Sequence, residues 1–318
     1  MTGSTQNHLI RTLLILAIWA SSCFADHEQS QQEQEPDFMD ETHEMISEQI
    51  TAPSIWFDEF FQDQRTDDEP AGTLVRLRGS MIVEEGEGVD FDGNIKARLK
   101  LPNLKRRFHL IFTSEDDELG SKTVKDARID EELGESKSNT LALQYTQKRT
   151  AKVNVSHRVR VETDGGLNPQ VRSRVRYRKP LTEQTVLTLE QAVFWEDEDG
   201  FGAESRFDFD YLLDDKELIR TSARGVMSEE SDGLEWAARL QWLKSFSHKR
   251  AVSVAAYTVG ETEPKSEVTE YGTFVKYRQR IYKEWLFVEV KPEVNWQRKN
   301  DFNSSGKMTL TLEIQFGK

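Results

Sequence analysis

Charged side chains recur at every second position in several segments of this chain, and they are the residues best suited to bind or orient a solute. In 171–178, Arg172, Arg174 and Arg176 alternate with apolar or small residues. This alternation indicates a β-strand with one polar and one apolar face. Extended over the chain, the same register places on one common face the basic residues Arg76, Arg78, Lys96, Arg98, Arg158, Arg160, Arg172, Arg174 and Arg176, mainly from its first half. The second half contributes mainly acidic residues to that face: Glu190, Glu204, Asp208, Asp210, Glu235, Glu270, Glu289, Glu293 and Glu313.

This polar face has two interpretations. In the first, it lines a water-filled path whose opposite walls carry opposite charge, so that charged or zwitterionic solutes bind and orient there. In the second, the same residues form ladders of ion pairs that brace a narrow structure without conducting anything. The sequence leaves both open.

A nucleophile with a neighbouring base has one candidate pair, His157 and Ser173. A hairpin through 162–169 would bring both onto the apolar face of adjacent strands. Metal chemistry has weaker candidates, because His109 is expected on the polar face and His248 in a turn. The acidic residues near Gly93 and Gly200 fall short of a calcium-loop spacing and fit ordinary Asp-Gly turns. They are Asp90, Asp92, Asp197 and Asp199. We predict no metal, no cofactor and no enzymatic activity.

The elements that must position these residues are strands. From Thr73 onward the chain alternates with period two, most clearly in 308–316, where Met308, Leu310 and Leu312 share one side and Thr309 and Thr311 the other. Mean hydropathy is -0.67, and beyond residue 25 no apolar run reaches the roughly 18 residues of a spanning helix. Segments such as 234–246 and 266–281 exceed ordinary globular strands and suit tilted membrane strands. The pattern predicts an all-β, antiparallel, up-and-down transmembrane barrel of about fourteen strands, with twelve as the alternative.

The connections alternate between two kinds, as they do in membrane barrels. Short, mostly basic turns are expected at 102–105, 148–152, 178–182, 213–217, 246–250 and 281–284. Longer, acidic or glycine-containing loops are expected at 84–88, 115–138, 162–169, 196–200, 228–233, 260–265 and 298–307. Tryptophan and tyrosine residues near the strand ends suit the two lipid–water interfaces. Thirteen connections return both chain ends to the side of the short turns, which we assign to the periplasm, with the loops outside.

Two segments are expected ahead of the barrel, a signal peptide at 1–25 and an acidic leader at 26–70. Residues 1–25 are predicted to be an export signal, with an apolar core at 13–20; Cys23 is either removed with it or acylated as in a lipoprotein. Residues 26–70 carry fifteen acidic residues against Arg65, which accounts for most of the net charge of -14 and argues against nucleic-acid binding. The barrel domain then covers 71–318.

Within the leader, 54–65 concentrates aromatic residues at helical spacing: Trp56, Phe57, Phe60 and Phe61. Ser54 is a candidate N-cap, with Asp58 and Glu59 close to the helix start. Such a helix needs a partner for its apolar side. It could close the periplasmic mouth, dock a periplasmic partner or lie on the rim.

Two segments, 91–118 and 270–296, resemble uncharacterised outer-membrane barrel proteins of Gram-negative bacteria. The resemblance covers roughly 56–316 and implies the outer membrane, with lipid, lipopolysaccharide and the barrel-assembly machinery as partners; it brings no known activity. Fourteen-stranded fatty-acid transporters are similar in layout, with an N-terminal segment in the barrel.

The placement of His157 and Ser173 resembles that in outer-membrane phospholipases, which carry a histidine and a serine on the barrel exterior. However, Val159 stands where their serine would be expected, and no asparagine is evident. Our first hypothesis is therefore a narrow or plugged pore for small charged or zwitterionic solutes. The alternative is a filled structural barrel whose leader docks a periplasmic partner, and a lipid hydrolase is third.

Overall fold

Fourteen strands and one short helix make up the part of the chain that the computed structural model describes, namely residues 51–61, 73–86, 88–100, 107–114, 139–150, 152–163, 167–197, 200–231 and 233–317. The helix spans 51–61. The strands are β1 (Leu74–Glu84), β2 (Gly88–Lys100), β3 (Phe108–Thr113), β4 (Thr140–Arg149), β5 (Val153–Glu162), β6 (Asn168–Pro180), β7 (Thr185–Glu196), β8 (Gly200–Asp214), β9 (Glu217–Ser228), β10 (Glu235–Ser247), β11 (Arg250–Glu261), β12 (Glu267–Tyr282), β13 (Leu286–Gln297) and β14 (Ser304–Gly317). A single 3₁₀ turn, η3 (Arg298–Asn300), follows β13.

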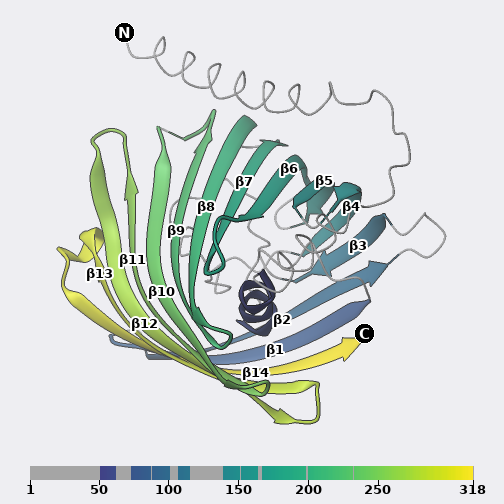
Figure 1. Cartoon of the computed structure of the whole chain (residues 1–318). Coiled ribbons are helices and arrows are strands. Elements are labelled where there is room, and N and C mark those ends of the chain that lie inside the picture. The colour runs from purple at the N-terminus through teal and green to yellow at the C-terminus, as the bar shows by residue number, and fades with distance from the viewer. Residues whose placement is uncertain are drawn as a thin grey trace.

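The strands form one closed antiparallel barrel in which each strand pairs with its neighbours in sequence. Closure is made by β1 and β14, which pair from Leu74 opposite Gly317 to Glu84 opposite Lys307. Figure 1 shows the strands curving around a common interior. Closure removes the exposed strand edges that an open sheet would leave. The predicted fold class and the count of fourteen strands are confirmed, and the twelve-stranded alternative is wrong.

The wall is apolar outside and polar inside. On β14, Met308, Leu310 and Leu312 are 39–48 % exposed, whereas Thr309 and Glu313 on the opposite face are buried. The other strands repeat this arrangement, which reverses that of a water-soluble barrel. A mainly apolar outer wall around a charged interior is the arrangement of a barrel that crosses a membrane with its strands. Among the described residues, no helix has the length and apolar character needed for a membrane span.

The connections fall on two rims, in the order that the sequence predicted. The turns after β8 and β10 occupy only residues 215–216 and 248–249, and the turns after β4, β6 and β12 lie on the same rim, which we call the short-turn rim. Both the first residue of β1 and the last of β14 lie there, because Leu74 pairs with Gly317. The strand ends joined by the other connections, which follow β1, β3, β5, β7, β9, β11 and β13, lie on the opposite rim, which we call the long-loop rim. The predicted turn at 102–105 and most of the predicted loop at 115–138 lie outside the described residues.

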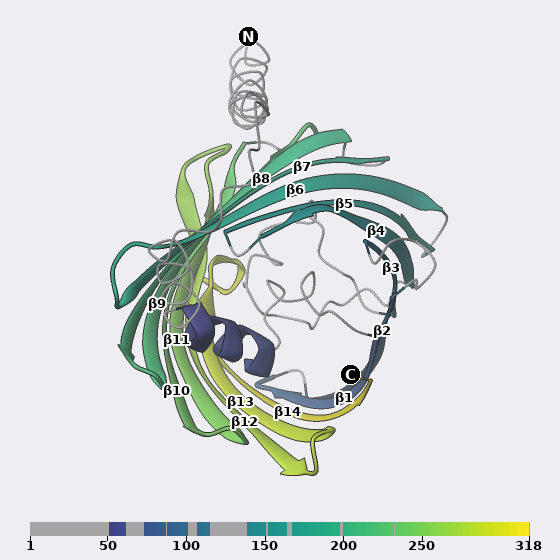
Figure 2. The same cartoon turned by 45° about the vertical axis from the view of Figure 1, so that its right-hand side comes forward.

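The helix lies inside the barrel at the short-turn rim, against the inner wall (Figure 2). We call residues 51–61 the aromatic helix. Residues 51–53, ahead of the predicted start at Ser54, are already helical, and residues 62–65 of the prediction lie outside the described ranges. Ser54 is therefore a helical residue rather than the cap.

Candidate functional site

The aromatic helix packs its rings on an apolar patch of the inner wall, at a place where that wall is otherwise polar. Phe57, Phe60 and Phe61 are at most 9 % exposed, and Trp56 packs beside them, with its ring centroid 4.8 Å from that of Phe60. The wall side of this cluster comes from β7 to β11 and β13: Val186, Leu212, Leu218, Leu243, Ala251 and Phe287. All six lie within a few residues of the short-turn rim. The helix and this patch therefore bury each other's apolar side chains.

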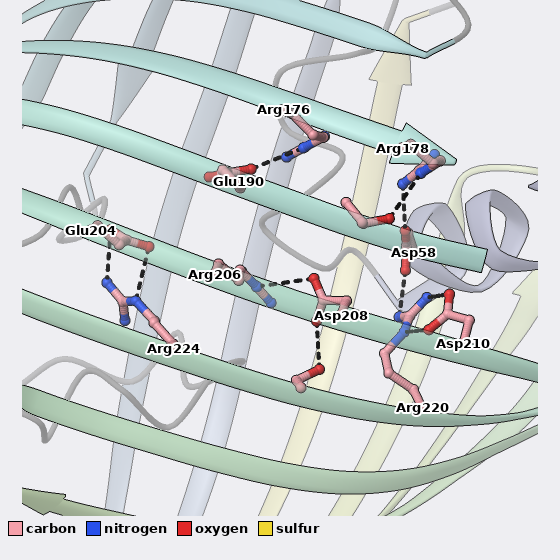
Figure 3. A network of polar contacts seen from close by, with 12 residues as sticks. Asp58, Arg176, Arg178, Glu190, Glu204, Arg206, Asp208, Asp210, Arg220 and Arg224 are labelled. Carbon is pink, nitrogen blue, oxygen red and sulfur yellow. Dashed lines mark hydrogen bonds and ion pairs between the residues drawn. The ribbon is translucent and has the colours of Figure 1, made fainter. Parts of the chain in front are cut away.

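Asp58 fixes the polar side of the helix. Its carboxylate is 1 % exposed and accepts hydrogen bonds from Arg220 Nη1 at 2.6 Å and from Arg178 Nη2 at 3.4 Å. Arg220 also donates from Nε and Nη2 to the two oxygens of Asp210, at 2.5 and 2.7 Å. Figure 3 shows Asp58 projecting from the helix between the two arginines. A buried carboxylate is stable only when it is paired in this way, so Asp58 ties the helix to β6 and β9.

Further from the helix, the inner wall carries a series of ion pairs within and between strands (Figure 3). Arg224 holds both oxygens of Glu204, at 3.0 and 3.3 Å, and Arg172 reaches the same carboxylate at 2.9 Å. Glu190 accepts from Arg176 Nε at 2.9 Å and lies 3.5 Å from Arg174 Nη1. Asp208 accepts from the hydroxyl of Ser222 and lies 3.4 Å from Arg206 Nε.

A second series runs through the strands that close the barrel. Glu313 on β14 accepts from Arg278 at 2.9 Å and from Arg78 at 3.0 Å. Arg278 also reaches Glu289 on β13 at 3.3 Å, and its guanidinium lies over the ring of Phe287, 4.6 Å from the centroid. This series links the wall near the aromatic helix to β1.

The remaining predicted lumen residues also occupy inward positions. Arg158 donates to Gln144 Oε1, at 2.8 Å from Nη2. Arg76 lies on β1, Lys96 and Arg98 on β2, and Glu235 on β10, each on the same face as the buried polar residues of its strand. The sequence thus identified the residues of the inner face, whereas their role as a solute path stays a prediction.

The predicted acidic wall is wrong. On β7–β14 the inward acidic residues lie beside inward basic residues that the sequence prediction did not include. These basic residues include Arg206, Arg220, Arg224, Arg278 and Lys291. Burying a carboxylate without a nearby cation costs several kcal/mol, so local pairing dominates. The inward face of β1–β6 differs: basic residues predominate, and the acidic ones are Glu84, Asp90, Asp92 and Glu162, toward the long-loop rim. We call these two inner faces the paired arc (β7–β14) and the basic arc (β1–β6).

A polar cluster on the outer wall surrounds His157. His157 on β5 pairs with Ser173 on β6 in the strand register, and its Nδ1 lies 3.0 Å from Ser173 Oγ. Its Nε2 lies 2.9 Å from Oε1 of Gln147 on β4. The sequence predicted the first contact and missed the second, because a β-bulge between Thr146 and Lys148 brings Gln147 beside His157. No group of three potential metal-ligating side chains occurs within the described ranges.

No protein-family model and no curated protein matches this chain. Solved structures with a similar arrangement include OccK10 (OpdN) of Pseudomonas aeruginosa, with a TM-score of 0.47 and 8 % identity over 78 % of this chain and 99 % of that one. A loop-deletion mutant of OmpT, an outer-membrane protein of Vibrio cholerae, gives 0.46 and 12 % identity over 78 % and 100 %. The KdgM porin, in complex with disordered oligogalacturonate, gives 0.39 and 7 % over 76 % and 99 %. At these values nothing about solute or mechanism carries over to this chain.

Proposed function

We propose that this protein is an outer-membrane pore for small charged or zwitterionic solutes, and that the aromatic helix is its plug. The observation that carries the proposal is Asp58, a buried carboxylate of the helix that is bonded to Arg220 and Arg178 of the wall. A helix that served only as apolar filling would not need a charged residue at the wall. The pair fixes one orientation of the helix, in which its rings meet the apolar patch.

The attachment is local and reversible in character. It includes six apolar wall residues and the carboxylate of Asp58, all near the short-turn rim. The wall keeps its own ion pairs beside it, since Arg220 holds Asp210 through two further hydrogen bonds. Withdrawal of the helix would leave Arg220 paired with Asp210, so the barrel could survive the loss of its plug.

The proposed orientation places the short-turn rim and both ends of the barrel domain in the periplasm. There the acidic leader would be accessible to a periplasmic partner that pulls on the helix. The outer wall would contact membrane lipid and, beyond the long-loop rim, lipopolysaccharide. The barrel-assembly machinery would insert the chain, as for other outer-membrane barrels. The opposing hypothesis is a filled structural barrel, in which the ion pairs of the paired arc serve stability alone.

Planar-bilayer recording of the full chain separates these hypotheses. The variant Asp58→Arg places a third cation beside Arg178 and Arg220, and removing one partner of a buried pair costs about 3–5 kcal/mol. We expect low conductance from the unmodified protein and a several-fold increase for Asp58→Arg. Glu59→Arg is the matched control, because it makes the same charge change one residue away on the exposed side of the helix, and we expect it to conduct like the unmodified protein.

Heat-modifiable gel mobility would establish that each variant is a folded barrel. If folded Asp58→Arg conducts no more than Glu59→Arg, the helix is not a plug that Asp58 holds in place. If neither variant nor the unmodified protein conducts at any voltage, the filled structural barrel replaces the pore.

A further inference from the structure

Three polar side chains meet on the lipid-facing wall, where polar groups are costly and usually serve a function. They come from three adjacent strands, with Gln147 on β4, His157 on β5 and Ser173 on β6. The apolar residues around them are largely exposed, including Val159 at 51 % and Val171 at 45 %. His157 is the fifth of the ten residues of β5, so the cluster lies within the span rather than in a loop.

The geometry is that of a nucleophile, a base and a positioning group. His157 Nε2 lies 2.9 Å from Gln147 Oε1, and a carbonyl oxygen can only accept, so this contact selects the neutral tautomer with its proton on Nε2. Nδ1 then carries the lone pair and faces Ser173 Oγ at 3.0 Å as an acceptor. The glutamine thereby sets the tautomer in which His157 can remove the proton of the serine hydroxyl. The ring of Tyr145 stacks on His157, with their centroids 6.2 Å apart, and restricts its rotation.

A donor for a developing oxyanion lies on the next strand. Gln191 on β7 pairs with Val175, and Ser173 pairs with Val193, so the glutamine is the diagonal neighbour of the serine on the same face. Its Oε1 accepts a hydrogen bond from Ser205 Oγ at 2.7 Å. That bond orients the carboxamide so that Nε2 is the end left to donate to a ligand.

From this arrangement we propose that the outer wall is a second active site, which hydrolyses acyl esters of membrane lipids with Ser173 as nucleophile and His157 as base. The proton of Ser173 passes to His157 Nδ1 as Oγ bonds to the carbonyl carbon of the ester. The bond to the lipid alcohol then breaks, and that alcohol leaves with the proton from His157. Water, the second reactant, attacks the acyl-serine with His157 again as base, and the fatty acid is released as the proton returns to Ser173.

The site opens on the bilayer itself, so its substrate would enter laterally from the lipid and not through the lumen. This activity is independent of the proposed pore, because the triad and the aromatic helix lie on opposite sides of the wall. Gln147 acts through His157 and is a positioning residue.

The test is release of oleic acid from vesicles of dioleoylphosphatidylcholine that contain the full-length protein, combined with labelling by a long-chain alkyl fluorophosphonate. We expect Ser173→Ala and His157→Ala to lower the rate at least 100-fold, and the label to attach to Ser173. Thr273→Ala, which removes an exposed hydroxyl on β12, should retain full activity. Release that is equal in all variants, or absent from the unmodified protein, would overturn the proposal.

The role of Gln147 has its own measurement. Gln147→Met removes the acceptor at similar length, and we expect kcat to fall about tenfold with KM unchanged, as for the loss of one hydrogen bond that sets the base. Gln147→Glu keeps an oxygen acceptor in the same place and should restore most of the rate. If both variants lose activity to the same extent, Gln147 is a structural residue and does not position the base.

Discussion

The two arcs of the inner wall use the same residue types to opposite effect. On the paired arc, carboxylates and guanidinium groups alternate between neighbouring strands, as in the bonds of Glu204 to Arg224 and of Asp210 to Arg220. On the basic arc, β2 presents Lys96, Arg98 and Lys100 at successive inward positions. The arginines of β6 lie at the boundary between the arcs and pair with Glu190 and Glu204 of the paired arc. The paired arc also holds the apolar patch that receives the aromatic helix.

In the proposed pore, this difference assigns different roles to the two arcs: the paired arc holds the helix, and the basic arc selects solutes by charge. A wall whose charges cancel locally exerts little long-range field, and it can hold a helix by short-range contacts. A wall of like charges has a field that extends into the lumen and selects solutes by sign. We therefore expect substitutions on the paired arc to change whether the pore is closed, and substitutions on the basic arc to change which ions pass.

The largest expected effect is on the plug. Phe57→Ala removes a ring that is 1 % exposed, and the loss of a buried phenylalanine costs about 3–5 kcal/mol. We expect the helix to leave the wall, which would raise the open probability in bilayer recordings and make 51–61 sensitive to protease. Ile55→Ala, at a half-buried position outside the ring cluster, is the control. A protected helix in Phe57→Ala would mean that Asp58 alone retains it.

A smaller effect is expected for ion selectivity. Arg158→Gln removes one positive charge from the basic arc, and a unit charge acting at about 4 Å in water is worth about 1 kcal/mol, or about fivefold in relative permeability. Measured on the unplugged Asp58→Arg background, the reversal potential in a salt gradient should move toward cations by an amount of that order. Arg206→Gln on the paired arc removes the same charge beside Asp208. Equal shifts for the two variants would erase the distinction between the arcs.

The sequence was sufficient for the barrel because a strand's alternation is local. Each outward residue in 308–316 is apolar whatever its neighbours are, and the thirteen connections follow from where alternation stops. The position of the aromatic helix was open for the opposite reason. Its apolar residues indicated a partner, but the partner patch combines single residues from six strands, such as Val186, Leu218 and Phe287, and no local pattern marks them.

Pairings between distant residues account for the other errors. Asp58 was interpreted as a favourable charge near a helix start, because the sequence gives no sign that Arg220, 162 positions away, would bond to it. The acidic wall was inferred from the residue types in each half of the chain, whereas ion pairing depends on which strands are adjacent. His157 and Ser173 were correctly placed together, since a hairpin fixes their register. The position of Gln147 beside His157 depends on the bulge in β4, which the sequence pattern did not indicate.

The smallest expected effect concerns side-chain packing in the two arcs. It tests whether the paired arc tolerates an added methyl group less well than the basic arc does. Gly272 on β12 lies beneath the ring of Tyr257, where an added Cβ would be 2.5 Å from the tyrosine hydroxyl oxygen. That hydroxyl bonds Glu270 and Glu293, each at 2.7 Å, so Gly272→Ala must displace it from two buried carboxylates.

We expect Gly272→Ala to lower the free energy of unfolding by about 1–3 kcal/mol, as for other overpacked sites, measured as the urea midpoint of the heat-modifiable form. Gly79→Ala on β1 is the matched control, because nothing lies within 4 Å of its added Cβ. That substitution should leave the midpoint unchanged or slightly raise it, since alanine narrows the unfolded ensemble. Equal losses at the two sites would show that glycine is required for strand curvature in general. The stability of the paired arc would then come from its ion pairs, and the packing of Tyr257 against Gly272 would contribute nothing specific.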